Sequence, residues 1–239
     1  MAVLALALVS ACTAPPPPAT MNDPNEVANR EVHDFNTSVD RALLRPASGT
    51  YGTSIPAPVK QGISNFSDNL GQPGNVLNGL LQGRPQNALE NTLRFAINTT
   101  VGIGGLFDPA RAIGLPGRKT DFGETLHVWG AGEGTYVVLP FIGPSTERDT
   151  VGAMVDFAIN PLQLLLPRPE SYVGPVAKIA SRLGDRSQYS DTLDSVLYDS
   201  ADGYAQTRLL YLQNRRFELG QAPSAEDAYL DPYEDPNAQ

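Results

Sequence analysis

The sequence is poor in the residues that most often carry catalysis and metal binding. Its 239 residues include one cysteine and two histidines, His33 and His127. A disulfide within the chain is therefore excluded, and there is neither an HExxH motif nor a histidine pair to hold a transition metal. The sequence also lacks a Gly-x-x-x-x-Gly-Lys phosphate loop, which argues against ATP binding. No cofactor and no metal site are expected.

Positive charge is scarce as well. The chain has 17 Lys and Arg against 26 Asp and Glu, which gives a net charge of -9. Nucleic-acid binding depends on clustered cations that release counterions from phosphate, and the sequence contains no such cluster. A nucleic-acid partner is therefore excluded. With 41% apolar residues the chain can still form a sizeable core.

The apolar run at the start of the chain is too short to span a membrane. Residues 1–11, MAVLALALVSA, are uncharged and precede Cys12. Residues 9–12, Val-Ser-Ala-Cys, resemble the bacterial lipobox, so we predict that residues 1–11 are a lipoprotein signal peptide and that Cys12 is the lipid attachment site. A simple export signal or a fortuitous apolar N-terminus is the alternative. No Lys or Arg precedes the run, which indicates that the true start lies upstream of Met1. An inner-membrane retention signal would usually have Asp directly after the cysteine, but this chain has Thr13. By these sorting rules the mature protein is predicted to lie at the periplasmic face of the outer membrane.

The body of the chain lies between two unusual ends. Residues 12–21 comprise the lipidated cysteine and a proline-rich tether, TAPPPPAT, which favours an extended polyproline-like conformation. Residues 221–239 hold five acidic residues, no basic residue and three prolines, which is typical of a disordered tail. Residues 22–220 are expected to form a single helical domain.

Apolar residues recur at helical spacing through this body. Asp23 as N-cap and Pro24 after it predict a helix that ends at Pro46. Gly71 to Gly74 are expected to separate the next two helices. The further helices are predicted at 57–70, 75–83, 86–100, after Ser145, 173–188 and 203–220. The fold class is therefore all-α.

Neutral polar residues dominate residues 61–107. This stretch has four charged residues, yet it is rich in Asn, Gln, Ser and Gly. A helix in water usually carries Lys and Glu on its outer face, whereas one among lipid headgroups or along a semi-polar channel can use neutral amides. A buried helical hairpin in a soluble domain explains the composition equally well.

The stretch DFGETLHVWGAGEGTYVVLPFIGPSTERD, residues 121–149, contains the residue types of a serine hydrolase. A Ser-His-Asp triad needs a serine on a strained turn, usually in Gly-x-Ser-x-Gly, but the chain has Gly-Pro-Ser-Thr-Glu. Pro144 has no amide hydrogen, and Ser145 before Thr-Glu-Arg is typical of a helix N-cap. We therefore interpret Ser145 as a cap and His127 as a packed residue; catalysis by Ser145 is the less favoured alternative.

The same stretch contains an uncharged apolar segment, which is either a buried strand or a loop or hairpin near 135–144 that dips into a bilayer. An indole just before it suits the headgroup level of a membrane, and exposed apolar area in a lipid-anchored protein is a second membrane contact. The predicted membrane-contacting residues are Trp129, Tyr136, Val138, Leu139, Phe141 and Ile142.

Five motifs in order resemble the MlaA/VacJ family of outer-membrane lipoproteins over about residues 22–165. These are DPNEVANREVHDFN, SNFSDNLGQPGNVLNGLLQG, LRFAINTTVGIGGLFDPA, the stretch 121–149, and DFAINPLQLLL. The resemblance implies a ring-like array of amphipathic helices seated in one membrane leaflet, with an amphipathic channel through the ring. It also implies that a channel or gate is formed by Phe35, Asn36, Asn65, Phe66, Gly102, Gly104 and Gly105.

The resemblance further implies that the protein is not an enzyme but removes mislocalised phospholipids from the outer leaflet. The lipid would pass through the channel to a periplasmic lipid-carrier protein, and a trimeric porin is the expected membrane partner. Two alternatives remain from the residues themselves: a structural or adhesive envelope lipoprotein, and a periplasmic esterase.

Overall fold

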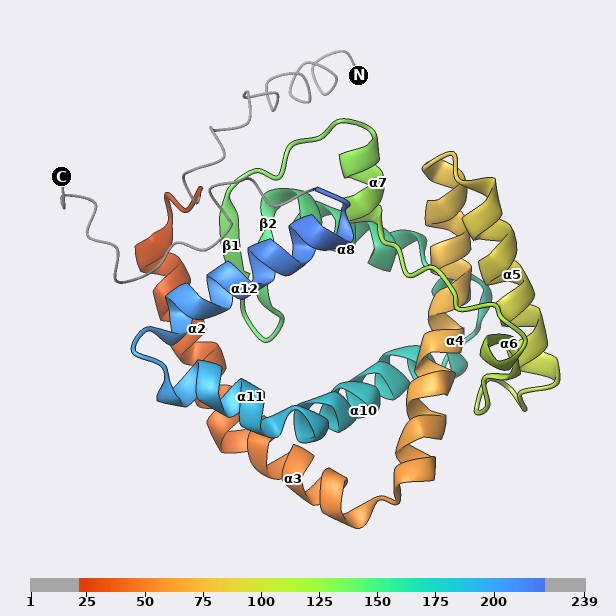
Figure 1. Cartoon of the computed structure of the whole chain (residues 1–239), viewed down its shortest axis with the longest axis horizontal. Coiled ribbons are helices and arrows are strands. Elements are labelled where there is room, and N and C mark those ends of the chain that lie inside the picture. Colours follow the sequence, from red (N-terminus) through yellow and green to blue (C-terminus); the bar gives the residue numbers. More distant parts are fainter. Residues whose placement is uncertain (1–21, 222–239) are drawn as a thin grey trace.

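Helices arranged in a ring make up most of the chain in the computed structural model, which describes residues 22–221 (Figure 1). The elements of the first half are α2 (Glu26–Val39), η1 (Asp40–Leu44), α3 (Arg45–Ser54), α4 (Ala57–Leu81), α5 (Pro85–Thr100), α6 (Pro109–Ala112) and α7 (Phe122–Val128). Those of the second half are β1 (Tyr136–Leu139), β2 (Gly143–Thr146), α8 (Glu147–Ile159), α9 (Pro161–Leu165), η2 (Glu170–Tyr172), α10 (Val173–Gln188), α11 (Ser190–Asp194), η3 (Ser195–Asp199) and α12 (Gly203–Glu218). The predicted helical fold is confirmed, with one hairpin.

The first helical stretch is longer than the sequence predicts, because Pro46 does not end it. The chain passes from α2 through a π-helical turn, η1, into α3, where Pro46 lies in the first turn. A proline has no backbone N–H, and in a regular α-helix its ring clashes with the carbonyl one turn earlier. The wider π turn before Pro46 makes room for this ring.

The start of the first helix also differs from the prediction. Asp23 is not its N-cap: α2 begins after Asn25, and Asp23 instead accepts hydrogen bonds from Asn29 and Arg208.

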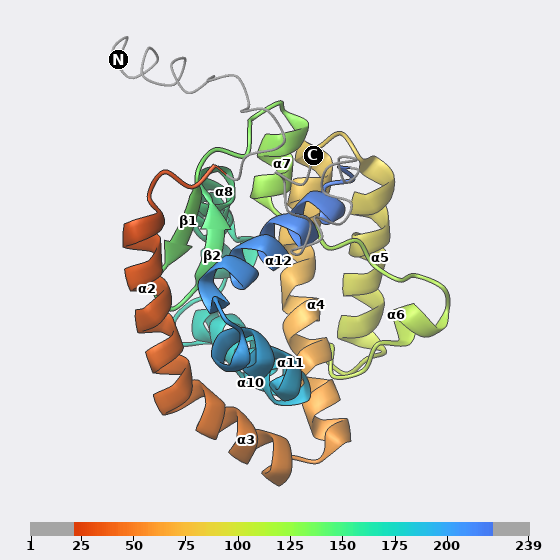
Figure 2. The same ribbon diagram turned by 60° about the vertical axis from the view of Figure 1, so that its left-hand side comes forward.

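Helix α4 runs unbroken where two helices were expected. Pro73 lies inside it, and the predicted break at Gly71–Gly74 is wrong. Helix α4 contacts α5 along one side and α10 along another (Figure 2). Tertiary packing on two sides therefore outweighs the low helix propensity of this segment.

Side-chain amides join α4 to its neighbours. Asn69 donates to Oγ1 of Thr99 on α5 at 3.0 Å. Asn78 donates to Oδ1 of Asp156 on α8 at 2.8 Å and accepts from Oγ1 of Thr125 at 2.9 Å. The neutral amides noted in the sequence therefore form the contacts between helices.

The hairpin β1–β2 lies where the apolar segment was expected. Tyr136 pairs with Thr146 and Leu139 pairs with Gly143 in an antiparallel register. Along β1, buried and half-buried residues alternate. The buried face packs on α12 and α2, so that the hydrophobic core consists of Tyr136, Val138, Tyr204 and Leu212, with Val32 and Tyr211 against it.

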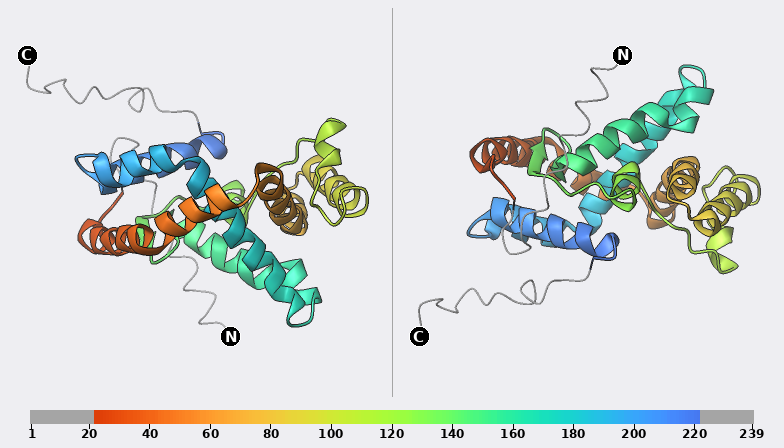
Figure 3. Two further views of the ribbon diagram at one scale, coloured as in Figure 1. Left: turned by 90° about the horizontal axis from the view of Figure 1, so that it is seen from below. Right: turned by 90° about the horizontal axis from the view of Figure 1, so that it is seen from above.

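Helices α8 and α10 form a lobe that projects from the ring and ends at the segment around α9 and η2 (Figure 3). Helix α12 returns along the ring to α2. There Arg30 donates to both carboxylate oxygens of Asp202, at 3.0 and 2.8 Å. The first and last described helices are thus joined, which closes the ring.

The burial pattern inverts that of a water-soluble domain. Buried side chains include many amides, and large apolar side chains are exposed instead. The buried amides are Asn29, Asn69, Asn78, Asn91, Asn98, Gln72 and Gln82. Within residues 22–221, no helix is both long and apolar enough to cross a bilayer.

Candidate functional site

A cavity of about 920 Å³ lies between the lobe and helices α4 and α12. The lining comes from helices that are far apart in the sequence: α4, α8, α9, α10 and α12, together with the start of α7. Most of its apolar residues lie on the lobe, and its charged residues lie at the start of α7 and on α8, η2, α10 and α12. The apolar lining residues are Leu70, Ala153, Phe157, Leu162, Leu166, Val173, Pro175 and others of this kind. The cavity therefore offers both an apolar and a polar wall to one ligand.

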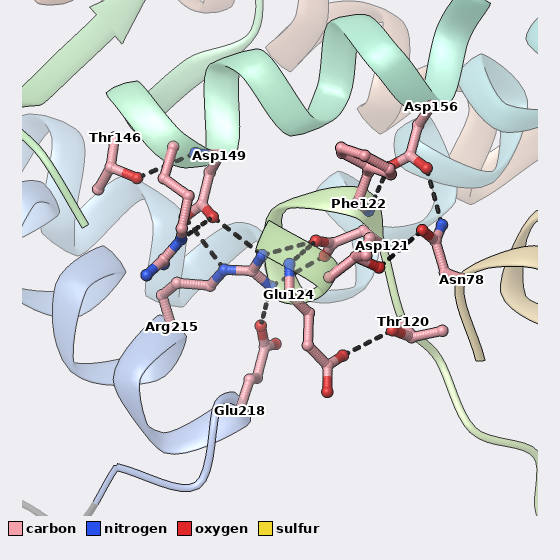
Figure 4. A network of polar contacts seen from close by, with 12 residues as sticks. Asn78, Thr120, Asp121, Phe122, Glu124, Thr146, Asp149, Asp156, Arg215 and Glu218 are labelled. Atoms are coloured by element: carbon pink, nitrogen blue, oxygen red, sulfur yellow. Dashed lines mark hydrogen bonds and ion pairs between the residues drawn. The ribbon is translucent and has the colours of Figure 1, made fainter. Parts of the chain in front are cut away.

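One wall is a charged cluster centred on Arg215 of α12 (Figure 4). Its Nη2 donates to Oδ1 of Asp121 at 2.7 Å and to Oδ1 of Asp149 at 3.0 Å, and its Nη1 lies 3.4 Å from Oε2 of Glu218. Burial alone would raise the pKa of Asp149, but hydrogen bonds and charge from Arg215, with a contribution from Arg148, lower it overall. The cluster joins α7, α8 and α12, so two carboxylates that look catalytic in the sequence hold helices together.

A second carboxylate on α8, Asp156, also reaches the cavity. It accepts from the backbone N–H of Phe122 and from Nδ2 of Asn78, both at 2.8 Å. Its pKa is raised, because burial disfavours the charged form more than these hydrogen bonds and Lys178 favour it. Asp156 thus fixes the start of α7 against α8.

Two cations of α10, Lys178 and Arg182, complete the charged lining. Neither was predicted as a site residue from the sequence. The available signal was their spacing of four residues, which places both on one face of the helix predicted at 173–188.

The predicted gate pair, Phe35 and Asn36, fastens α2 to the tip of the hairpin. Asn36 donates from Nδ2 to the carbonyl of Leu139 at 2.9 Å and accepts from the N–H of Phe141 at 2.7 Å. Phe35 packs edge-on against Phe141 with ring centroids 5.2 Å apart. Phe141 also adopts a left-handed backbone conformation, φ 64°. Neither Phe35 nor Asn36 lines the described cavity, so the pair stays a predicted gate rather than a channel wall.

The other predicted channel residues also lie away from the cavity lining. Asn65 donates to the carbonyl of Leu106 at 3.1 Å, beyond the end of α5, and Phe66 is half-buried in α4. The glycines shape the turn that follows α5. A Cβ at Gly102 would overlap the carbonyl oxygens of Asn98 and Phe107.

Gly104 and Gly105 belong to the same turn, with φ of 72° and 97°. A Cβ at Gly105 would also approach Asn69 of α4 to 2.6 Å. Asn65 and Gly105 thus lie where α4 meets the turn beyond α5, and the channel or gate role of Asn65, Phe66 and the three glycines stays a prediction.

The predicted membrane-contacting residues divide into two groups. Phe141, Ile142 and Trp129 are 74%, 69% and 56% exposed, whereas Leu139 is half-buried. Tyr136 and Val138 are 1% and 7% exposed, which corrects the prediction for these two. The physical reason is the alternation of a strand, which turns Tyr136 and Val138 toward α12 while the hairpin tip points outward.

The serine that resembles a nucleophile is buried and bonds to its own segment and to Tyr211 of α12. Ser145 accepts from Oγ1 of Thr150 at 3.0 Å and donates to the carbonyl of Thr146 at 3.3 Å. Thr146, not Ser145, is the N-cap of α8, since its Oγ1 accepts from the N–H of Asp149 at 3.2 Å. Burial and the charge of Arg148 lower the pKa of His127.

Three predicted segments lie outside the described residues: the signal peptide 1–11, Cys12 with its tether to residue 21, and all but the first residue of the tail 221–239. Within the described part, no group of three or more His, Cys, Asp or Glu side chains is arranged to hold a metal ion.

Comparison with known proteins identifies close relatives. The sequence profile of the MlaA lipoprotein family matches residues 21–218. The intermembrane phospholipid transport system lipoprotein MlaA of Escherichia coli (strain K12) is 36% identical over 222 residues, which cover 91% of this chain and 84% of that protein. The protein of the same name from Haemophilus influenzae is 33% identical over 204 residues, covering 83% of this chain and 79% of its own length.

The fold also resembles a solved structure. A structure from work on the structural basis for maintenance of bacterial outer membrane lipid asymmetry superimposes with a TM-score of 0.68 and 34% sequence identity. The match covers 82% of this chain and 98% of that one. The helical arrangement around the cavity is therefore shared over most of the body.

Proposed function

The chain belongs to the MlaA lipoprotein family, and we propose that it maintains outer-membrane lipid asymmetry by removing mislocalised phospholipids from the outer leaflet. The observation that carries the proposal is the amphipathic cavity inside a ring whose outer surface is rich in apolar side chains. A phospholipid has the same two-part chemistry as this cavity. The names of the relatives support the same function.

The exposed apolar side chains support a position within one leaflet. Phe141 and Ile142 at the hairpin tip, and Val101 and Ile103 beyond α5, are all more than half exposed. Each large apolar side chain that leaves water contributes about 1.5–3 kcal/mol. A lipid anchor on Cys12 adds about 0.8 kcal/mol for each buried methylene group, so the two contacts together hold the ring in the membrane.

Transport through such a ring requires no covalent chemistry. The headgroup follows the polar wall and the acyl chains follow the apolar wall. A misplaced phospholipid moves downhill from the outer leaflet, so this component needs no ATP. The lipid then passes to a periplasmic carrier, and a trimeric porin supports the ring in the membrane.

Filling the cavity tests this function directly. Ala153 of α8 lines the cavity, so Ala153→Trp places a large side chain in the path of the lipid. We expect mass spectrometry of the detergent-purified protein to find less bound phospholipid. In a strain that lacks its own homologue, the variant should fail to restore detergent resistance.

Ala158→Trp is the matched control, because Ala158 is exposed on the same helix and is not among the cavity-lining residues. It should bind lipid and complement as the wild type does. Absence of phospholipid from the wild-type protein, or equal lipid binding and complementation by both variants, would contradict the proposal.

A further inference from the structure

Two cations of helix α10 face the cavity. Lys178 and Arg182 are four residues apart and both line it. Residues at this spacing are neighbours on one face of a helix, about 6 Å apart along the axis. Both side chains are exposed. The two cations therefore form one positively charged position on the wall.

These cations lack the partners that neutralise the other arginines of the region. Arg215 is bonded to Asp121 and Asp149, and Arg186, one turn beyond Arg182, donates to both carboxylate oxygens of Asp40 at 3.0 and 2.9 Å. Among the ion pairs of residues 22–221, none includes Lys178 or Arg182. Lys178 acts on Asp156 only through its charge, without a hydrogen bond or ion pair, so both cations can still form direct contacts with a ligand.

The remaining charges of the lining restrict where an anion can bind. Asp121, Asp149 and Glu218 surround Arg215, Asp156 on α8 lies within range of the charge of Lys178, and Glu170 lies on η2 before α10. An anion is repelled by these carboxylates and attracted to α10, since electrostatic interactions are strong in a partly enclosed cavity. The cavity therefore has one anion-binding position.

Apolar lining begins on the same helix. Val173 and Pro175 precede Lys178, and Leu162 and Leu166 of the lobe line the cavity beside them. The rise of a helix places Lys178 about 7.5 Å and Arg182 about 13.5 Å beyond Val173 along the axis. An occupant with its charged end at Lys178 and Arg182 therefore has its apolar part directed to the end of the lobe around α9.

We propose that Lys178 and Arg182 bind the phosphodiester of a glycerophospholipid during its passage, with the acyl chains against the apolar side of the lobe. This inference rests on the proposed function and names the part of the lipid that is recognised. Lysine and arginine both bind phosphate by charge-assisted hydrogen bonds. The position is a binding site for phosphate attached to apolar chains, not for phosphate alone.

The test measures how tightly the full-length protein in detergent binds two fluorescent lipids. One is phosphatidylglycerol; the other is diacylglycerol with the same acyl chains but no phosphate. The wild type should bind phosphatidylglycerol more tightly. Replacing both cations, with Lys178→Gln and Arg182→Gln, should weaken phosphatidylglycerol binding on the order of 10-fold or more while diacylglycerol binding stays unchanged. The single variant Lys178→Arg should retain the preference.

Arg111→Gln with Lys119→Gln is the control, because it removes the same charge from a surface that is not part of the cavity lining. This control variant should bind both lipids as the wild type does.

Inorganic phosphate should fail to displace the labelled lipid at millimolar concentration. Displacement at low concentration would identify free phosphate as the ligand and overturn the lipid site. Equal binding of phosphatidylglycerol by the wild type and the double variant would overturn the phosphate position but leave the transport function intact. No binding of either lipid by the wild type would instead contradict the proposed function.

Discussion

Single side chains in the 136–146 hairpin have roles that their chemical type does not reveal. Val138 belongs to the hydrophobic core with Tyr136, Tyr204 and Leu212. Ser145 is buried, and its hydroxyl bonds to Thr146 and Thr150 and interacts with Tyr211 of α12. Tyr211 keeps its hydrogen bond to Asp149 when Ser145 is removed, whereas a charge at position 138 has no partner in the core.

We accordingly expect Val138→Asp to unfold the hairpin and abolish function. A buried unpaired carboxylate costs about 3 kcal/mol or more. Ser145→Ala should cost about 1 kcal/mol, and both Ser145→Ala and His127→Ala should complement. The measurements are detergent resistance in a strain lacking the homologue and protein level by blot.

A stable, correctly localised Ser145→Ala protein without function would contradict this view and favour the esterase alternative. A Val138→Asp protein that is present in the wild-type amount but has no function would show that the residue acts in lipid contact rather than in folding.

The Arg215 cluster makes a second prediction at the residue scale, for the dependence of stability on pH. The folded-state pKa of Asp149 lies below its ordinary value of 3.8. A carboxylate with a lowered pKa contributes stability above the unfolded pKa, and that contribution is lost as the pH falls through the folded pKa. Thermal melts should therefore show a loss of stability below about pH 4.

Asp149→Asn should lower stability at neutral pH by on the order of 1–3 kcal/mol and flatten the acid limb of the curve. The exposed carboxylate Asp34 supplies the control variant, Asp34→Asn, which should retain the wild-type acid limb. An acid limb in Asp149→Asn as steep as that of the wild type would refute the assignment.

At the scale of elements, α2 supports β1 through two asparagines. Asn29 donates to the carbonyl of Tyr136 at 3.1 Å and accepts from the N–H of Val138 at 2.9 Å. Asn36, seven residues and about two turns later, makes the equivalent pair of bonds at the hairpin tip. The free edge of β1 is thus paired with helix side chains in place of another strand.

The two pairs of hydrogen bonds, made by Asn29 and Asn36, differ in burial, so their removal should have different effects on the protein. The bonds of Asn29 are buried, whereas Asn36 and Phe35 hold an exposed tip. We predict that deletion of Phe35 and Asn36, or the milder pair Phe35→Ala and Asn36→Ala, changes the resting shape of the ring without unfolding it. Outer-leaflet phospholipid and envelope permeability should change while the protein level is kept.

Asn29→Ala is the comparison for this prediction. It leaves a buried N–H and a buried carbonyl of β1 unpaired, so it should lower stability by about 2 kcal/mol. A folded and anchored Phe35–Asn36 deletion variant with normal permeability would rule out the gating role.

At the scale of the whole molecule, the ring exposes apolar side chains and buries amides. This arrangement is unfavourable in water and requires a membrane around the ring. Lipid attachment at Cys12, a residue outside the described part of the chain, would place the protein at the membrane.

We predict that Cys12→Ala releases the mature body from outer-membrane fractions or leaves the precursor unprocessed, because Cys12 is the only thiol that can accept a lipid. The measurement is palmitate labelling with fractionation, and Ser10→Ala, which keeps a small residue before the cysteine, is the control. Normal labelling of the Cys12→Ala protein would refute the lipidation site.

The helical class, an apolar strand, loop or hairpin near 135–144, the family motifs and the neutral amide content of residues 61–107 could all be read from the sequence. These features are local: the periodicity of a helix and the composition of a segment are read from adjacent residues. The bounds of α10 were predicted from 173 to 188 and are confirmed. The continuity through Pro46 and Pro73 was not predicted, because packing partners distant in sequence stabilise those turns.

Only the tertiary structure decided which residues meet in the cavity. Lys178 and Arg182 share the cavity with carboxylates of α7, α8 and α12 because α10 packs on α3 and α4, which lie far earlier in the chain. Closure of the ring places Tyr136 and Val138 in the core and leaves Phe141 outside. Burial depends on which elements pack together, and spacing along the chain sets only which side chains share a face.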